Sequence, residues 1–110
     1  MKPRTLSGMP EKLYTIWLDD LTFVHVEFLT IRGSVVSFVV RLMRQTGGRW
    51  LNVARYDTAH GQPHRDILDR RGWVVRKDWL TGMSFEEALT LAKNDLVTNY
   101  ESYIETFENS

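Results

Sequence analysis

The sequence predicts an α+β fold, in which one long C-terminal α-helix packs on one face of an antiparallel sheet of four to five strands. Three observations lead to this fold class. Segments rich in β-branched and aromatic residues alternate with period two through the first half of the chain. Turn-forming residues separate these segments, and beyond residue 83 apolar residues recur at spacings of three and four. The length of 110 residues and the hydrophobic content of 43% suit a single domain, residues 1–110.

The predicted strands form a meander, in which each strand pairs with the next one along the chain. They cover residues 12–18, 22–30, 35–45, 49–56 and 73–79. In the second strand Val24, Val26 and Phe28 fall on one face, which we expect to be the buried one. The Thr-Gly-Gly sequence at 46–48 supplies the positive φ angles that a tight hairpin needs. Residues 1–11 are expected to be a loose lead-in to the first strand.

The clearest local pattern is the start of the predicted helix, which covers residues 84–107. Ser84 and Glu87 form a capping box, in which the two side chains satisfy free amides at a helix start. Apolar side chains then form one stripe along the helix: Phe85, Leu89, Ala92, Leu96, Tyr100, Tyr103 and Phe107. A helix of this extent is about 35 Å long, so it can cover a whole sheet.

The charges are segregated along the chain although the formal net charge is zero. Residues 41–77 hold nine basic side chains against three acidic ones, a net charge of +6. Residues 78–110 hold seven acidic side chains against a single lysine, a net charge of −6. Two interpretations stay open. The basic segment faces a polyanion such as RNA, or the acidic C-terminal segment lies across it and neutralises it.

The composition excludes several classes of function. The chain has no cysteine, which excludes disulfides, thiolate catalysis and cysteine-ligated metal sites. No apolar run approaches the roughly 18 to 20 residues of a membrane span, so no membrane partner is expected. The N-terminal residues lack the apolar region of a secretory signal, which predicts a cytoplasmic location. No glycine-rich phosphate loop is present, and no cofactor is expected.

The candidate functional residues gather after the fourth predicted strand. Residues 57–72 combine two histidines, six charged residues, two glycines and a proline, and are predicted to form an irregular loop. The predicted catalytic residues are His60, His64 and Asp57. The predicted substrate-binding residues are Arg55, Tyr56, Arg65 and Asp66.

These assignments follow from side-chain chemistry. Because histidine titrates near neutral pH, His60 and His64 are candidates for a general acid and a general base. Asp57 would orient one of the histidines. Arg55 and Arg65 would hold a phosphate group and stabilise the charge that grows on it during transfer. Aromatic side chains beside the arginines are able to stack on unpaired bases, although core packing is the more usual role of tryptophan in strands.

The same segment permits two other interpretations. Asp57, His60, His64 and Asp66 offer oxygen and nitrogen ligands to a divalent ion, but their spacing matches no established metal motif, and we predict no metal site. Alternatively the polar groups are structural, and they lock the loop through hydrogen bonds.

One sequence motif resembles a known family. Arg55-Tyr56-Asp57, followed by Ala59-His60-Gly61 and His64-Arg65-Asp66, is similar to the Tyr-Asp…Ala-His-Gly…His pattern of TumE-like proteins, which are assigned as toxins of type II toxin–antitoxin modules. The resemblance implies a small cytoplasmic protein with an antitoxin partner and an action on RNA. Such sequences often carry a further histidine after the second one, at the position of Asp66.

The leading hypothesis is therefore a toxin-like protein that acts on RNA, as a metal-independent ribonuclease. The competing hypothesis is a noncatalytic interaction module, in which the arginine, aspartate and histidine side chains are structural. In that case an exposed sheet edge or the long helix binds a protein partner or a second copy of the chain.

Overall fold

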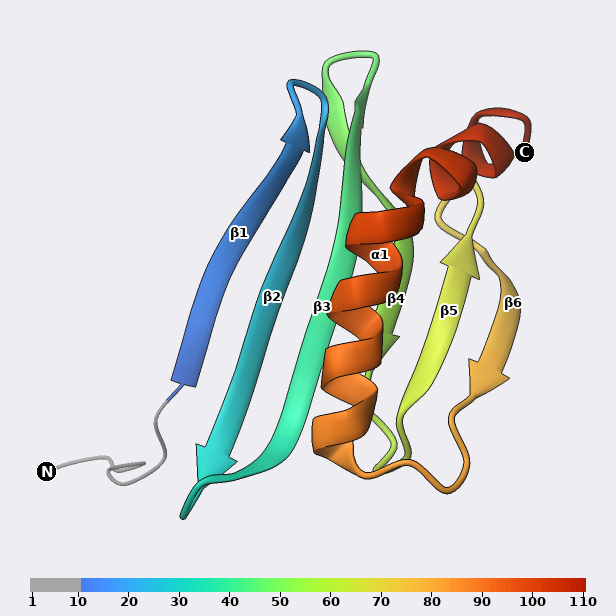
Figure 1. The fold of residues 1–110 in the computed structure, drawn as a ribbon. Helices are drawn as coiled ribbons and strands as arrows, with labels where there is room; N and C mark the ends of the chain where they lie inside the picture. Colours follow the sequence, from blue (N-terminus) through green and yellow to red (C-terminus); the bar gives the residue numbers. More distant parts are fainter. Residues whose placement is uncertain (1–10) are drawn as a thin grey trace, which may run out of the picture.

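The structure, a computed structural model, describes residues 11–110 and contains one antiparallel sheet with a single helix on one face (Figure 1). The strands lie in chain order, β1-β2-β3-β4-β5-β6, and each pairs with its sequence neighbour. The elements are β1 (Glu11–Asp19), β2 (Thr22–Ile31), β3 (Ser34–Thr46), β4 (Arg49–Asp57), β5 (His64–Leu68), β6 (Val74–Trp79) and α1 (Phe85–Glu108). The predicted α+β class and meander are confirmed. The predicted lead-in lies outside the described residues except for Glu11, which begins β1.

The number of strands was predicted wrongly, because the sheet has six strands and not four to five. The additional strand is β5, inside the segment 57–72 that was predicted to be an irregular loop. Its alternation has the usual period of two, but the buried positions include His64 and Asp66. A pattern search that expects apolar residues at buried positions misses such a strand.

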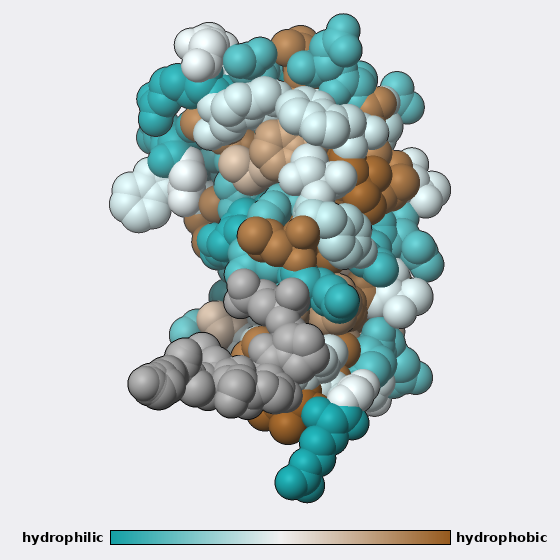
Figure 2. Space-filling model, turned by 90° about the vertical axis from the view of Figure 1, so that its left-hand side faces the viewer, coloured by the Kyte–Doolittle hydropathy of each residue, from teal (hydrophilic) through white to brown (hydrophobic). Residues whose placement is uncertain are grey.

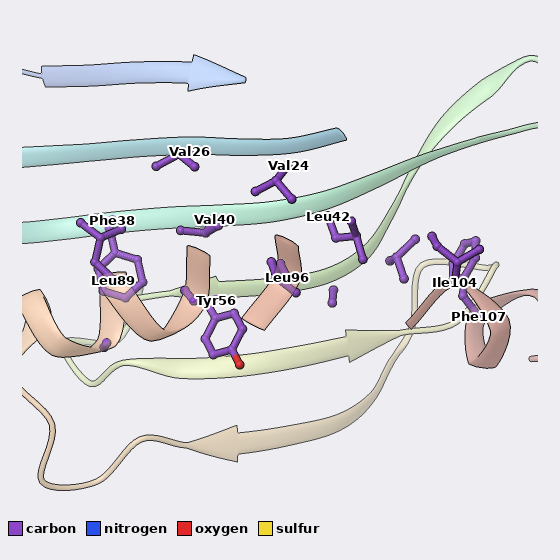
Figure 3. Packing of buried hydrophobic residues seen from close by; sticks show 14 residues of the cluster. Val24, Val26, Phe38, Val40, Leu42, Tyr56, Leu89, Leu96, Ile104 and Phe107 are labelled. Carbon is purple, nitrogen blue, oxygen red and sulfur yellow. The ribbon is translucent and has the colours of Figure 1, made fainter. Parts of the chain in front are cut away.

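The hydrophobic core lies between α1 and the face of the sheet that the helix covers, which we call the helix-side face. Figure 3 shows side chains from β2, β3 and β4 pointing toward α1. The core includes Val24, Val26, Phe38, Val40, Leu42, Ala54, Leu89, Leu96, Ile104 and Phe107. The buried face expected in the second strand is confirmed for Val24 and Val26, whereas Phe28 is only partly buried. The same alternation continues in β3, where Phe38, Val40 and Leu42 are buried. Val36 is exposed, because the pairing of β2 with β3 shifts beside it and leaves Val36 without a partner.

The helix begins where the sequence predicts. Ser84 is the N-cap, its hydroxyl accepts a hydrogen bond from the Glu87 amide, and the Glu87 carboxylate accepts one from the Ser84 amide. At Asn99 the backbone leaves the helical conformation, with φ −110° and ψ 16°, and the helix is kinked. Past the kink Phe107 is buried as predicted, but Ile104 enters the core while Tyr103 is only half-buried.

The face of the sheet opposite α1, which we call the open face, carries no other helix among residues 11–110 (Figure 1). Within the same residues, no helix combines the length and the apolar composition that a membrane span requires.

Candidate functional site

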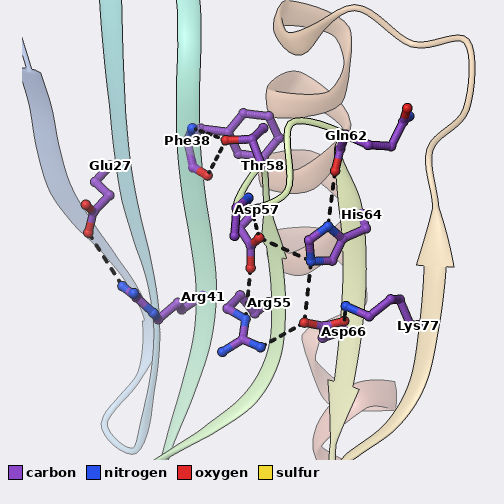
Figure 4. Close-up of polar contacts among 11 residues, drawn as sticks. Glu27, Phe38, Arg41, Arg55, Asp57, Thr58, Gln62, His64, Asp66 and Lys77 are labelled. Atoms are coloured by element: carbon purple, nitrogen blue, oxygen red, sulfur yellow. Dashed lines mark hydrogen bonds and ion pairs between the residues drawn. The ribbon is translucent and has the colours of Figure 1, made fainter.

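The pairing of β4, β5 and β6 brings five charged or polar side chains together on the open face. Asp57 is opposite His64 and Arg55 is opposite Asp66. On the next strand Lys77 is opposite Asp66. Since directly opposed residues of antiparallel strands project to the same face, the five side chains form one cluster (Figure 4). We call it the polar cluster.

Asp66 is the most tightly held acid of the polar cluster. Its carboxylate accepts a hydrogen bond of 2.6 Å from Lys77 Nζ and one of 2.8 Å from Arg55 Nη2. Arg55 Nε lies 3.0 Å from Asp57 Oδ2, so one guanidinium bridges the two carboxylates. Burial alone raises the pKa of Asp66, but the hydrogen bonds from Lys77 and Arg55 outweigh it and hold the pKa below its ordinary value. Asp66 is therefore ionised at neutral pH.

His64 is buried, with 2% of its side chain exposed, and has oxygen atoms at both ring nitrogens. Nδ1 lies 3.1 Å from the carbonyl oxygen of Gln62, and Nε2 lies 3.1 Å from Asp57 Oδ1. Nε2 also lies 3.6 Å from Asp66 Oδ2. Both contacts are hydrogen bonds only when both nitrogens carry a proton, because a neutral imidazole has a single N–H. Neither nitrogen is free to bind a substrate.

The segment between β4 and β5 folds back over the polar cluster. Thr58 is buried, and its Oγ1 accepts a hydrogen bond of 3.0 Å from the Phe38 amide. Asp57 Oδ1 accepts a bond of 2.9 Å from the Ala59 amide. Gly61 has a φ of +78°, which allows the chain to turn back toward β5. These contacts place the exposed His60 ring on the ring of His64, with 5.9 Å between the centroids.

A depression of about 430 Å³ lies beside the two histidines. Its cationic lining comes from Arg41, Arg55 and Lys77, of which Lys77 is exposed and the two arginines are half-buried. His60 and His64 also line it, so the exposed imidazole of His60 and the cations border the same space. We call it the histidine pocket. Asp57 and Asp66 line it as well, so its cations lie beside carboxylates as well as beside open space.

Two predicted substrate-binding residues, Tyr56 and Arg65, lie on the helix-side face. They are opposite each other in the pairing of β4 with β5, one position away from the polar cluster, and therefore point to the other side of the sheet. Arg65 binds Asp78 through Nε at 3.0 Å and donates from Nη1 to the Tyr103 hydroxyl at 2.9 Å. Arg55 and Arg65 are thus unable to hold one phosphate together.

A second polar network surrounds Asp95 on the helix-side face. Tyr56 donates to Asp95 Oδ2 at 2.6 Å, Tyr103 donates to the same oxygen, and Asn99 donates to Oδ1 at 2.8 Å. Burial raises the pKa of Asp95, but the tyrosine hydrogen bonds lower it more, so the pKa lies below its ordinary value. Burial and the bond to Asp95 raise the pKa of Tyr56. The network joins the sheet to both sides of the helix kink.

The sequence interpretation missed Asp95, Lys77 and Arg41. Asp95, Asn99 and Tyr103 follow each other at intervals of four, the spacing that places side chains on one helix face, so a detectable signal was present. Lys77 and Arg41 had no such signal. Their membership of the pocket depends on the pairing of β3 with β4 and of β5 with β6.

Most cations of the basic segment have acidic neighbours. Arg41 lies 3.5 Å from Glu27, and Arg44 lies 3.4 Å from Glu108. The acids come from the strands as well as from the C-terminal segment, so the interpretation in which the C-terminal segment neutralises the basic one holds only in part. Cations on the helix-side face, Arg65 and Arg76, both bind Asp78. The net charge of +6 does not form one continuous surface.

Comparison with known proteins supplies the family. Residues 9–110 match the family model described as "Domain of unknown function (DUF7718)". The chain belongs to this family. No curated protein and no solved structure matches it. Nothing in the match to the DUF7718 family concerns toxins, so the resemblance to TumE-like proteins stays a prediction.

The polar cluster of this DUF7718 chain also contains three possible metal ligands that lie close enough together to bind one ion. Ligand atoms of Asp57, His64 and Asp66 all lie within 4.8 Å of one another. However, Arg55 and Lys77 already bind these carboxylates, and a divalent ion would have to displace them. His60, the fourth predicted ligand of the metal alternative, is not part of the group. The donor set therefore favours an ion-pair network over a metal centre.

Proposed function

We propose that this protein acts on single-stranded RNA at the histidine pocket, as a metal-independent ribonuclease of a cytoplasmic toxin–antitoxin pair. One observation carries the proposal. The exposed His60 ring stacks on the buried His64 ring beside a pocket whose lining includes Arg41, Arg55 and Lys77. Proton transfer and phosphate binding are the two requirements for cleavage of RNA by its own 2′-hydroxyl group.

In this proposal the two histidines have different tasks. His60 is exposed, so its ring is able to take the proton of the 2′-hydroxyl group. The 2′-oxygen then forms a bond to phosphorus, the bond from phosphorus to the 5′-oxygen breaks, and the leaving oxygen takes a proton from water. His64, held by Asp57 and the Gln62 carbonyl oxygen, positions His60. Arg55 and Lys77 stabilise the charge on the phosphate oxygens.

The test is cleavage of a mixed-sequence single-stranded RNA by the purified protein, with and without EDTA. We expect the parent protein to cleave and EDTA to have no effect. His60→Ala should lower the rate by about 10² to 10⁴ times, the usual contribution of a general base. A persistent rate in His60→Ala would overturn the proposal, and a loss of activity in EDTA would assign Asp57, His64 and Asp66 to a metal site.

A matched pair of variants separates the pocket from general charge effects. Arg76 and Lys77 are neighbours in β6 but project to opposite faces, because Arg76 is opposite Ile67 and Lys77 is opposite Asp66. Lys77→Gln should slow cleavage, whereas Arg76→Gln removes the same charge from the helix-side face and should leave the rate unchanged. Equal effects of the two variants on the cleavage rate would mean that the rate depends on the net charge of the protein and not on the position of Lys77.

A second candidate is the noncatalytic interaction module, with a second copy of the chain or an antitoxin as partner. It is favoured by the pairing of Arg55 and Lys77 with buried carboxylates, which is also what a purely structural lock requires. Under this alternative the parent protein does not cleave RNA. Sedimentation velocity of the protein alone and with the protein encoded next to it would detect the complex.

A further inference from the structure

A second feature of the open face is a cluster of three packed aromatic rings. The Trp17 ring lies 5.0 Å from Phe23 and 5.7 Å from Trp50, and Phe23 lies 4.9 Å from Trp50, all between centroids. The residues come from β1, β2 and β4, at the end of the sheet where the turns β1–β2 and β3–β4 lie (Figure 1). We call this group the aromatic cluster.

The aromatic cluster leaves large apolar surface in contact with water. Trp17 is 59% exposed and Trp50 is 39% exposed. Single exposed apolar residues are ordinary, but contiguous exposed rings on an uncovered sheet mark a contact surface. Figure 2, which views the molecule from the β1 side, shows apolar and aromatic side chains among hydrophilic ones on this side. Tryptophan offers a flat ring on which any unpaired base is able to stack.

The aromatic cluster and the histidine pocket lie on the same face. Trp50 and Asp57 are seven residues apart, an odd number that would place them on opposite faces of a regular strand. The pairing of β3 with β4 shifts between Leu42 and Met43, which adds one residue to β4 and restores the common face. At about 3.3 Å per residue the two positions are about 23 Å apart, within reach of a single strand of several nucleotides.

Two cations lie between the aromatic cluster and the histidine pocket. Arg41 and Arg55 are directly opposite each other in β3 and β4, on the open face. Both guanidinium groups have carboxylate neighbours, Glu27 beside Arg41 and Asp57 and Asp66 beside Arg55. About a third of each arginine side chain is still exposed (35% and 29%), so the phosphates of an RNA strand that runs from the aromatic cluster to the histidine pocket are able to reach them. A two-fold interface with a second copy would instead place the same cationic strip on both subunits. The exposed parts of the two guanidinium groups favour a polyanion as the occupant.

We infer that the aromatic cluster is a second anchor for the RNA strand that the histidine pocket holds. Unpaired bases stack on Trp17 and Trp50, while the phosphate of another nucleotide lies beside His60. This inference rests on the proposed function and extends it, because it defines the substrate as an unpaired strand long enough to bridge both sites.

Fluorescence anisotropy with uncleavable 2′-O-methyl oligouridylates of 3 and 10 nucleotides tests the inference. The parent protein should bind the 10-mer at least tenfold more tightly than the 3-mer, since only the 10-mer reaches both sites. The variant Trp17→Ala/Trp50→Ala should lose at least tenfold in affinity for the 10-mer and keep its affinity for the 3-mer. The control is Trp73→Ala, which removes a tryptophan that is 67% exposed outside the aromatic cluster and should change neither affinity.

The possible outcomes distinguish a failure of this inference from a failure of the ribonuclease proposal. If the folded double variant binds the 10-mer as the parent does, the aromatic cluster is not an anchor and the ribonuclease proposal stands. If the parent binds neither oligomer, both proposals fail. If the parent sediments as a dimer and the double variant as a monomer, with equal RNA affinities, the aromatic cluster is a self-association surface. Circular dichroism confirms that each variant is folded.

Discussion

At the scale of single residues, His64 joins the segment between β4 and β5 to the sheet. Its Nδ1 contacts the Gln62 carbonyl oxygen on one side and its Nε2 contacts the Asp57 carboxylate on the other. The Trp79 ring packs against it, with 5.1 Å between the centroids. Because the side chain is buried, removing it leaves acceptors in the interior without donors. His60 stacks on the same ring from the solvent side.

We expect His64→Ala to lower the free energy of unfolding by about 1 to 3 kcal/mol, the cost of buried polar groups without partners. His60→Ala is the matched control, and an exposed residue of this kind should change stability by less than about 0.5 kcal/mol. Urea denaturation followed by tryptophan fluorescence measures both. Equal effects of the two variants would show that the buried hydrogen bonds of His64 contribute little.

At the scale of elements, α1 depends on its first turn and on its kink. The capping box holds the first turn, and Glu86 binds the Val35 amide of β3 at 2.9 Å. The carboxylate of Glu87 accepts hydrogen bonds from Ser84, and these bonds lower the pKa of Glu87 below its ordinary value. Past the kink at Asn99, the helix places Ile104 and Phe107 in the core. Both ends of the helix are therefore fixed to the sheet.

Ser84→Ala should lower the free energy of unfolding by about 1 kcal/mol, because the amide of the first turn loses its acceptor. The control is Ser102→Ala, an exposed serine inside α1, where alanine has the higher helix propensity and stability should stay equal or rise slightly. Thermal unfolding followed by circular dichroism compares them. If both variants have the melting temperature of the parent, the capping box does not limit the stability of the helix.

At the scale of the whole molecule, one charged network lies on each face of the sheet. Asp66 anchors the network on the open face, and Asp78 and Asp95 anchor the one on the helix-side face. The hydrogen bond from Arg65 lowers the pKa of Asp78. Asp66 and Asp95 also have lowered pKa values, since their hydrogen bonds outweigh the effect of burial. The three carboxyls therefore bind protons less readily in the folded chain.

This predicts a loss of stability in acid. A carboxyl with a lowered folded pKa stabilises the protein fully above its unfolded value, near 3.8, and the stabilisation is lost as the pH falls through the folded value. The free energy of unfolding should thus fall steeply below about pH 4. Asp66→Asn should make this fall shallower, whereas Asp20→Asn, an exposed turn residue, should not. Urea denaturation from pH 7 to about pH 3 measures the slopes, and identical slopes would contradict the prediction.

Local sequence patterns determined much of this molecule. The alternation around Val24 and Val40 predicts strands with a buried face, and the helix begins at the capping box of Ser84. The candidate residues Asp57, His64 and Asp66 do share one site. The strand β5 was not predictable in the same way, because its buried positions carry a histidine and an aspartate that are stable there only with partners from β4 and β6.

The fold class, the capped helix and the gathering of polar residues around His60 are readable from short segments, because each depends on neighbours within a few positions of the chain. Which polar residues contact one another depends on how the strands pair in the folded chain. Strand pairing brought Lys77 and Arg41 to the histidine pocket and sent Tyr56 and Arg65 to the other face. A side chain's face depends on the parity of its position, and its partners depend on the register between strands, which no short segment encodes alone.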